Sequence, residues 1–333
     1  MANISLQELR GLIVRVLISS KTSSDNAASV ASALIQADAD GIPSHGVARL
    51  PIYADQSKCG KVDGFAKPKL SNPGTAVIHV DGKCGFAFPA IDMGLTEAIE
   101  MVEIPGVVAV AVGNTSHAGV LGHHVERIAN RGLASMAFVN TPAAISPWGG
   151  NQPIYGTNPI AFACPRINES PLVIDLSLSK VARGKIKLAS EKGEAIPNDW
   201  AKDINGNPTT NPDAVIHGGS LRPIGDAKGA ALALIVELMS AAMTGSKFGN
   251  EASSFFDTKG GPSKTGQFFF IFKPEALGGN NVFSRIEILI SAINDQEGTR
   301  IPGERRLNNR SIAKSNGVEI SDELLEDLNW RAR

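Results

Sequence analysis

Apolar residues near the start of the chain recur at intervals of three and four, which is the spacing of one helical face. The first such series is Leu6, Leu9, Ile13, Val16 and Leu17. Ser5 and Glu8 form a capping box at its start, so the spacing predicts a helix that begins there. A second helix is predicted from Ser24 to Gly41, where Gly41 and Pro43 end it.

The pattern changes after about residue 75, where short β-type runs are separated by Gly, Pro or Asn. These predicted strands are Thr75–Val80, Val107–Val112, Ser135–Val139, Pro159–Ala163, Leu172–Asp175 and Gln267–Phe272. Helical patterns occur at about 89–103, 120–131 and Phe283–Asn294, and Lys228–Met243 predicts a buried helix. The stretch 187–225 is rich in Asn, Pro, Gly and Asp and predicts long loops.

This order predicts a mixed α/β (α+β) protein, in which a β-rich centre is inserted between two helical ends. The expected domains are a helical one, made of residues 1–72 and 295–333, and a central one of residues 73–294.

Composition narrows the class of protein. The chain has 32 basic and 33 acidic residues, so it lacks the basic excess that is typical of nucleic-acid-binding proteins. The stretch Ala230–Met243 is too short to span a bilayer and contains Glu237. Met1–Val16 includes Glu8, Arg10 and Arg15, unlike a secretory signal. We therefore expect a cytoplasmic protein with neither a membrane nor a nucleic-acid partner.

The three cysteines, Cys59, Cys84 and Cys164, form no C-x-x-C pair, which favours ordinary thiols in a reducing compartment. His123 and His124 have no carboxylate or thiol at ligand spacing, so they are interpreted as surface or packing residues and no metal site is predicted. The motifs G-x-G-x-x-G, G-x-x-x-x-G-K-[ST], G-x-S-x-G and H-E-x-x-H are absent, so the sequence does not support a standard dinucleotide fold or a phosphate-binding loop of the usual kind.

The first polar cluster is Pro43-Ser44-His45-Gly46-Val47-Ala48-Arg49, and it continues to Tyr53. In a helix, His45, Arg49 and Tyr53 are four residues apart and share one face. Arginine binds a carboxylate with two hydrogen bonds, histidine exchanges a proton near neutral pH, and Ser44 can orient the imidazole. The same pattern also fits an ordinary surface helix that starts at a serine, and Pro51 weakens a helical geometry.

The second cluster, Gly113-Asn114-Thr115-Ser116-His117-Ala118-Gly119, follows the strand-like run Val107–Val112. Free backbone N–H groups at the start of the next helix can hold a phosphate, and His117 can bind a charge or act in catalysis. A glycine-rich turn with a capping serine is the alternative.

Four more segments carry polar groups at turns or at the ends of predicted elements. Tyr155-Gly156-Thr157-Asn158-Pro159 indicates only a turn. Asp175-Leu176-Ser177 ends a strand, where aspartate contacts a ribose or caps a helix. Asp226-Ala227-Lys228 opens a helix and suits an anion. Arg300-Ile301-Pro302-Gly303-Glu304-Arg305-Arg306 suits a 2′-phosphate or is a solvated turn.

In their order along the chain, these clusters together resemble the type-2 malate/L-lactate dehydrogenase family, over about residues 5–330. That family includes ureidoglycolate dehydrogenase, diketogulonate reductase, sulfolactate dehydrogenase and the Δ1-piperideine-2-carboxylate/Δ1-pyrroline-2-carboxylate reductases. The matching segments are Ser44-His45-Gly46-x-x-Arg49, Ser116–Gly119, Tyr155–Phe162, Asp175–Ser177, Ala182–Lys185, Lys228-Gly229 and Ile301–Arg305.

The resemblance implies a non-Rossmann nicotinamide-binding domain with a largely antiparallel sheet, joined to a helical domain from both termini. It also implies a homodimer whose cleft lies near the subunit interface. The missing G-x-G-x-x-G motif agrees with this fold.

The resemblance further implies roles for individual residues. His45 would be the proton donor, supported by Ser44, and Arg49 with Tyr53 would bind the substrate. Thr157, Arg183 and Gly184 would also face the substrate. The expected contacts of the nicotinamide cofactor are His117, Ala118, Gly119, Val120, Leu121, Asp175, Leu176, Ser177, Asp226, Ala227, Lys228, Arg300, Ile301, Pro302, Gly303, Glu304, Arg305 and Arg306.

Two assignments stay open. The piperideine-carboxylate reductases have an aspartate after the Arg-Gly pair, where this chain has Lys185, which would lower the pKa of a nearby histidine or bind an anion. In ureidoglycolate dehydrogenase-like members the histidine that matches His117 is the acid–base. We favour His45, because Arg49 on the same predicted face would place a carboxylate beside it.

The leading hypothesis is an NADPH-dependent reductase of a cyclic ketimine carboxylate, Δ1-pyrroline-2-carboxylate or Δ1-piperideine-2-carboxylate, with NADH also possible. The short chain and the pair Arg305–Arg306 favour it. The alternative is a malate, L-lactate or ureidoglycolate-type 2-hydroxy-acid dehydrogenase, which Lys185 fits better. A third hypothesis is a catalytically silent binding protein that keeps the fold.

Overall fold

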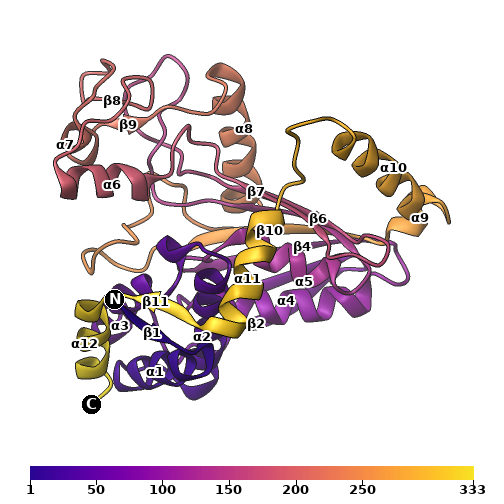
Figure 1. Cartoon of the computed structure of the whole chain (residues 1–333), viewed down its shortest axis with the longest axis horizontal. Coiled ribbons are helices and arrows are strands. Elements are labelled where there is room, and N and C mark those ends of the chain that lie inside the picture. The colour runs from indigo at the N-terminus through magenta and orange to yellow at the C-terminus, as the bar shows by residue number, and fades with distance from the viewer.

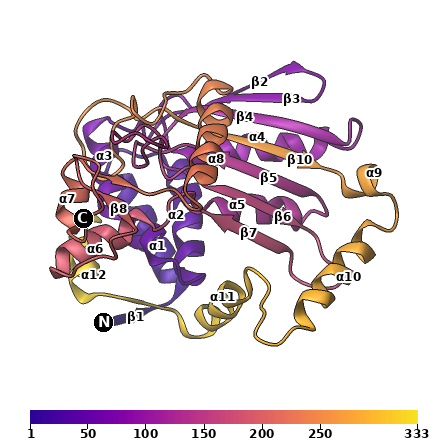
Figure 2. The same ribbon diagram turned by 90° about the horizontal axis from the view of Figure 1, so that it is seen from above.

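The computed structural model describes all residues from Met1 to Arg333 and has a seven-stranded sheet at its centre (Figures 1 and 2). The strand order is β2-β3-β4-β10-β5-β6-β7. Only β3 and β4 are parallel, so the predicted mixed α/β fold with a largely antiparallel sheet is confirmed. The strands are β2 (Lys69–Gly74), β3 (Val77–Asp81), β4 (Val107–Thr115), β5 (Ala134–Val139), β6 (Ile160–Cys164), β7 (Leu172–Leu176) and β10 (Thr265–Phe272).

One face of this sheet is covered by helices α4 (Ala87–Met101) and α5 (Leu121–Ala129), as both views show. Alternate residues of each strand point to the same face, so Val108, Val110 and Val112 of β4 are all fully buried there. Helix α4 lies close to the strands, because a Cβ on Gly94 would stand only 2.9 Å from a methyl group of Val110.

Residues from both ends of the chain form a second, helical core. It contains α1 (Leu6–Ser19), α2 (Ser24–Ala39), α3 (Leu50–Cys59) and α12 (Asp322–Arg331). The Ser5 side chain accepts a hydrogen bond from the Glu8 N–H, so the predicted capping box is confirmed. Strands β1 (Ala2–Ile4) and β11 (Val318–Ile320) pair, and the Met1 ammonium lies 2.7 Å from Asp322. The exact domain boundaries stay a prediction.

The region 187–225 differs from the long loops that its composition predicted. It continues α6 (Arg183–Lys192) and contains α7 (Pro212–Ile216) and the short pair β8 (Ala201–Lys202) and β9 (Ser220–Leu221). Most of the region is loop, as predicted, and the prediction missed these short elements because they expose most of their residues and bury only a few apolar ones, such as Ile186 and Ala189 of α6. They have a small core of their own beside the sheet.

The segment predicted as one buried helix is also different. It is α8 (Ala227–Glu237) followed by a π-helical turn (Leu238–Ala242), and several of its apolar side chains are exposed in the single chain. Leu234 is 43% exposed and Ile235 48% exposed, because no other element covers that side of α8. The remaining helices are α9 (Pro274–Gly278), α10 (Val282–Asn294) and α11 (Glu304–Asn316). None of the helices is both long enough and apolar enough to cross a bilayer.

Candidate active site

A cavity of about 500 Å³ lies where the helical core, the sheet and the α6 region meet, and its volume is within the range of ligand-binding sites. Half of the site residues that the sequence predicted line this one cavity. They are Ser44, His45, Arg49, His117, Gly119, Val120, Leu121, Thr157, Asp175, Ser177, Arg183, Gly184 and Lys185.

The segment that carries His45 and Arg49 is not the continuous helix to Tyr53 that the spacing predicted. It forms two 3₁₀ turns, Pro43–His45 and Val47–Arg49, and α3 begins only at Leu50, with Pro51 in its first turn. The Asp38 carboxylate accepts a hydrogen bond of 2.7 Å from the Val47 N–H and fixes the bend between the two turns. Burial raises the pKa of Asp38 to about 7, although this hydrogen bond lowers it.

This bend still brings the predicted groups together. His45 and Arg49 line the cavity, whereas Tyr53 is 2% exposed and lies behind it. The bend also requires a glycine at position 46, because a Cβ there would stand within 2.5 Å of the Asp38 carboxylate.

Two imidazoles face each other in the cavity, with 5.4 Å between the ring centres of His45 and His117. The Nδ1 atom of His45 lies 3.0 Å from the Ser44 hydroxyl. The Nδ1 atom of His117 lies 2.6 Å from the Tyr53 hydroxyl. Burial raises the pKa of Tyr53, so its hydroxyl stays protonated and can donate to His117. A neutral His117 then carries its own proton on Nε2.

Both imidazoles are neutral at pH 7 in this structure. Burial, followed by the charges of Arg49 and His123, lowers the pKa of His45 to about 4. Burial, Arg49 and His45 lower the pKa of His117 well below its ordinary value. A neutral imidazole beside a guanidinium accepts a proton readily once an anion offsets the positive charge.

Three cationic side chains, Arg49, Arg183 and Lys185, line the cavity without a carboxylate partner. Arg49 donates to the Ser44 carbonyl at 2.8 Å, and Arg183 donates to the Ala143 carbonyl at 3.3 Å. The only acid in the lining, Asp175, accepts a hydrogen bond of 2.7 Å from the Gly122 N–H, and burial raises its pKa. The lining therefore has an excess of positive charge that suits an anionic ligand.

Some predicted cofactor residues lie outside this cavity. Asp226, Ala227 and Lys228 are at the start of α8, where Asp226 forms an ion pair with Arg222. Ala118 and Leu176 are beside the cavity and do not line it. Of the segment 300–306, Ile301 is buried and Arg305 is exposed.

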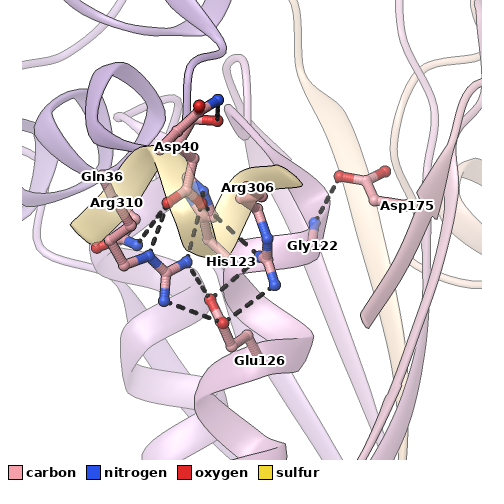
Figure 3. A network of polar contacts seen from close by, with 9 residues as sticks. Gln36, Asp40, Gly122, His123, Glu126, Asp175, Arg306 and Arg310 are labelled. Atoms are coloured by element: carbon pink, nitrogen blue, oxygen red, sulfur yellow. Dashed lines mark hydrogen bonds and ion pairs between the residues drawn. The ribbon is translucent and has the colours of Figure 1, made fainter. Parts of the chain in front are cut away.

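Arg306 is held in a network of ion pairs with Asp40, Glu126 and Arg310 (Figure 3). The Arg306 guanidinium lies 3.1 Å from Glu126, so the group that the sequence assigned to a phosphate already has a carboxylate partner. Arg310 bonds to both Asp40 and Glu126, and His123 bonds to Asp40 at 2.9 Å. The network joins the end of α2 to α5 and α11.

Several residues that shape the site could not be predicted from the sequence. Phe255 and Phe256 come from an irregular loop, and Phe255 packs against His117 with 5.1 Å between the ring centres. In the sequence, Glu237 was noted only as a charged residue that disfavours a membrane-spanning segment. Its buried carboxylate accepts hydrogen bonds from Asn158, Asn140 and the Gly249 N–H, beside the cavity residue Thr157.

Comparisons with known proteins identify the same family that the residue clusters of the sequence resemble. The profile of the malate/L-lactate dehydrogenase family matches residues 4–329. The (2R)-3-sulfolactate dehydrogenase (NADP(+)) of Chromohalobacter salexigens is 49% identical, over 98% of this chain and 96% of the relative. The Δ1-pyrroline-2-carboxylate/Δ1-piperideine-2-carboxylate reductase of Pseudomonas putida is 36% identical, over 88% and 86%. The crystal structure of Δ1-piperideine-2-carboxylate reductase from Pseudomonas syringae has a TM-score of 0.94 at 33% identity, over 99% of this chain and 100% of that one.

Proposed function

The chain belongs to the malate/L-lactate dehydrogenase family and is an NAD(P)-dependent oxidoreductase, and from this premise we propose that its substrate is a 2-hydroxy acid with a second anionic group. The first candidate is (2R)-3-sulfolactate, because the relative of 49% identity is named a dehydrogenase of this compound. Malate carries its two negative charges at the same spacing.

One observation carries this proposal, namely the charge balance of the cavity. Arg49, Arg183 and Lys185 have no acidic partner, and the one carboxylate in the lining is already bound to a backbone N–H. Unpaired charges in a partly buried site are costly, and a substrate with two negative charges relieves this cost. A single carboxylate leaves at least one guanidinium without an anion.

The side chains of the cavity have separable tasks in this proposal. The planar guanidinium of Arg49 binds the substrate carboxylate with two parallel hydrogen bonds. The adjacent His45 accepts the proton of the 2-hydroxyl group on oxidation and returns it on reduction. His117, with a proton on Nε2, donates a hydrogen bond to the oxygen at C2 and helps to orient it.

The residues around the start of α5 fit a nicotinamide cofactor. The backbone N–H groups of Gly119, Val120 and Leu121 make no hydrogen bond within the chain, and all three residues line the cavity. Free N–H groups at a helix start suit a phosphate, and Asp175 and Ser177 beside them suit ribose hydroxyls. When bound, the cofactor exchanges a hydride with C2 of the substrate. The name of the relative of 49% identity favours NADP(H).

A cyclic ketimine carboxylate is the second candidate, because the P. putida relative is named a reductase of such compounds. Reduction of an imine is favoured by a proton on its nitrogen, which makes it a cation. Lys185 and the two arginines disfavour a cation in this cavity, so we place this candidate second.

The test is a substrate panel with purified protein and both cofactors. Sulfolactate, malate and lactate are oxidised in one set, and oxaloacetate, pyruvate and Δ1-pyrroline-2-carboxylate are reduced in the other. We expect the highest kcat/KM with a dianionic hydroxy or oxo acid and NADP(H). A higher kcat/KM with the ketimine would replace our proposal by the second candidate.

We also propose that the protein is a homodimer. Leu232, Leu234 and Ile235 of α8 and Leu238 at the start of the π-helical turn form an exposed apolar surface, and burying such a surface against a second copy is favourable. Sedimentation velocity should give the mass of two chains, and a single-chain mass at micromolar concentration would contradict this proposal.

A further inference from the structure

We propose that Phe256 is a specificity-determining residue, which holds Arg49 and Arg183 apart as two anion sites, and that Lys61 positions the loop that carries it. This inference rests on the proposed function, since it explains how one cavity recognises two negative groups on the same small substrate.

The first observation is that both guanidinium groups contact one aromatic ring. The central carbon of the Arg49 guanidinium lies 4.5 Å from the centre of the Phe256 ring, and that of Arg183 lies 5.7 Å from it. These distances are typical of cation–π contacts, in which the negative face of the ring attracts a cation. The ring therefore stabilises two like charges that would otherwise repel each other across the cavity.

The second observation concerns the origin of the two arginines. Arg49 ends the second 3₁₀ turn before α3, and Arg183 begins α6, so two different elements bring them to the cavity. Each also donates one hydrogen bond to a backbone carbonyl, which leaves its other N–H groups free for a ligand. Phe256 is the side chain that touches both groups.

The third observation is that the loop around Phe256 has no helix or strand to hold it in place. Residues 249–264 are turns and irregular backbone. The Lys61 side chain is 3% exposed, and its ammonium donates to the carbonyls of Ser254 and Lys259 in this loop at 2.7 Å each. It also donates to the Asp257 carbonyl at 3.0 Å, and Gln56 donates to the same carbonyl at 2.9 Å.

Lys61 therefore acts as an internal cation around which the loop folds. Its three N–H groups match three carbonyl oxygens, and the Asp257 carboxylate at 3.3 Å offsets its charge. The residues that it binds flank Phe255 and Phe256 on both sides. Because Lys61 and Gln56 belong to the segment at and after α3, the loop is fixed to the same part of the chain that carries Arg49.

The consequence for substrate choice is geometric. In sulfolactate and malate, two carbon atoms separate the two anionic groups. In this proposal, Arg49 and Arg183 each contact the Phe256 ring and each takes a different anion. Lactate satisfies only one of the two arginines. The ring thus favours a dianion over a monoanion.

The test compares Phe256→Leu with the wild type on sulfolactate, malate and lactate. We expect the ratio of kcat/KM for either dianion to that for lactate to fall tenfold or more, mainly through KM of the dianion. Phe256→Tyr keeps the ring and should restore the ratio to within threefold. Phe248→Leu changes a phenylalanine of the neighbouring segment that does not line the cavity, and it should leave the ratio unchanged.

The role of Lys61 is tested with Lys61→Met, and the control is Lys58→Met on the exposed side of α3. Lys61→Met should lower the same ratio and make the 249–264 loop more sensitive to limited proteolysis. If this variant does not fold, Gln56→Leu removes one bond of the same loop and should change the ratio in the same direction. A lower melting temperature with an unchanged ratio would overturn the positioning role.

The outcomes separate this inference from the proposed function. If the wild type does not prefer a dianion to lactate, the proposed function is wrong and the inference falls with it. If the wild type prefers the dianion and Phe256→Leu keeps that preference, the proposed function stands and the role of Phe256 is refuted.

Discussion

Replacing Arg49 should change two quantities at once, because its guanidinium lines the cavity in which we propose that the substrate binds and its charge acts on His45. Arg49→Met keeps much of the volume of the side chain and removes the charge and the hydrogen-bond donors. Arg49→Lys keeps the charge and removes the planar fork that binds a carboxylate with two bonds. The pair of variants therefore separates the two effects of one residue.

The magnitude follows from the contacts of the guanidinium. Two charge-assisted hydrogen bonds to a carboxylate contribute about 1.5–3 kcal/mol each, so Arg49→Met should cost roughly 3–6 kcal/mol of transition-state binding. We expect kcat/KM to fall by about two to four orders of magnitude, largely through KM. Arg49→Lys should lie between this variant and the wild type, since a single ammonium replaces the fork.

The second quantity is the pKa of His45, which burial and the charge of Arg49 lower to about 4. Without that charge, the pKa should rise toward its ordinary value of 6.5 in Arg49→Met, whereas Arg49→Lys should leave it low. Oxidation requires the neutral imidazole, so the acidic limb of the pH profile of kcat/KM should move to higher pH only in the methionine variant. Titration of the His45 resonance by NMR in the free protein measures the same shift directly.

The control is Arg15→Met, which changes an exposed arginine of α1 and should match the wild type in both assays. Our reasoning would be refuted if the methionine variant kept a low His45 pKa and an unchanged KM. In that case His45 and Arg49 would not share one ligand cavity in solution.

Three further predictions concern catalysis and stability. His45→Ala should lower kcat by two orders of magnitude or more and leave the dissociation constant of NADPH nearly unchanged, as stopped-flow kinetics and fluorescence titration would show; an unchanged kcat would assign the proton transfer to another group. Arg310→Met removes one ion-pair partner from both Asp40 and Glu126. Breaking such a buried network should lower the free energy of unfolding, measured by urea denaturation, by about 3–5 kcal/mol. A loss below about 1 kcal/mol would contradict a structural role for the network. Burial lowers the pKa of His124 to about 4, so between pH 6.5 and 4 the unfolded chain binds a proton at this residue that the native protein does not bind. The free energy of unfolding should therefore fall by roughly 3 kcal/mol as the pH decreases through this window. Denaturation of His124→Gln at several pH values should show a weaker dependence of this free energy on pH.

The sequence determined the elements whose signals are local. The capping box at Ser5 and Glu8 marks the start of α1, and the apolar runs from 107 to 176 mark strands, because these patterns depend on neighbours a few residues away. The ordered clusters around His45, His117 and Arg183 also identified most of the cavity lining and the family. Such clusters are readable because each carries its own unusual combination of residue types.

Local spacing failed where a distant group changed the backbone. The pattern of His45, Arg49 and Tyr53 predicts a helix, but the Asp38 carboxylate binds the Val47 N–H and forces two short turns instead. The result keeps His45 and Arg49 in the cavity and moves Tyr53 behind His117. A hydrogen bond to one backbone N–H thus overrode the helical periodicity.

Only the tertiary structure decided which charges are free and which are paired. Arg306 looked available for a phosphate, yet it meets Glu126, which is 180 residues away in the chain. Arg49 and Arg183 have no such partner, and the loop with Phe256 reaches them through Lys61, which lies nearly 200 residues before that loop. The periodicity of apolar residues shows which face of each helix or strand is buried. The pairing of charges depends on which elements pack together, and that is fixed by the burial of the whole core.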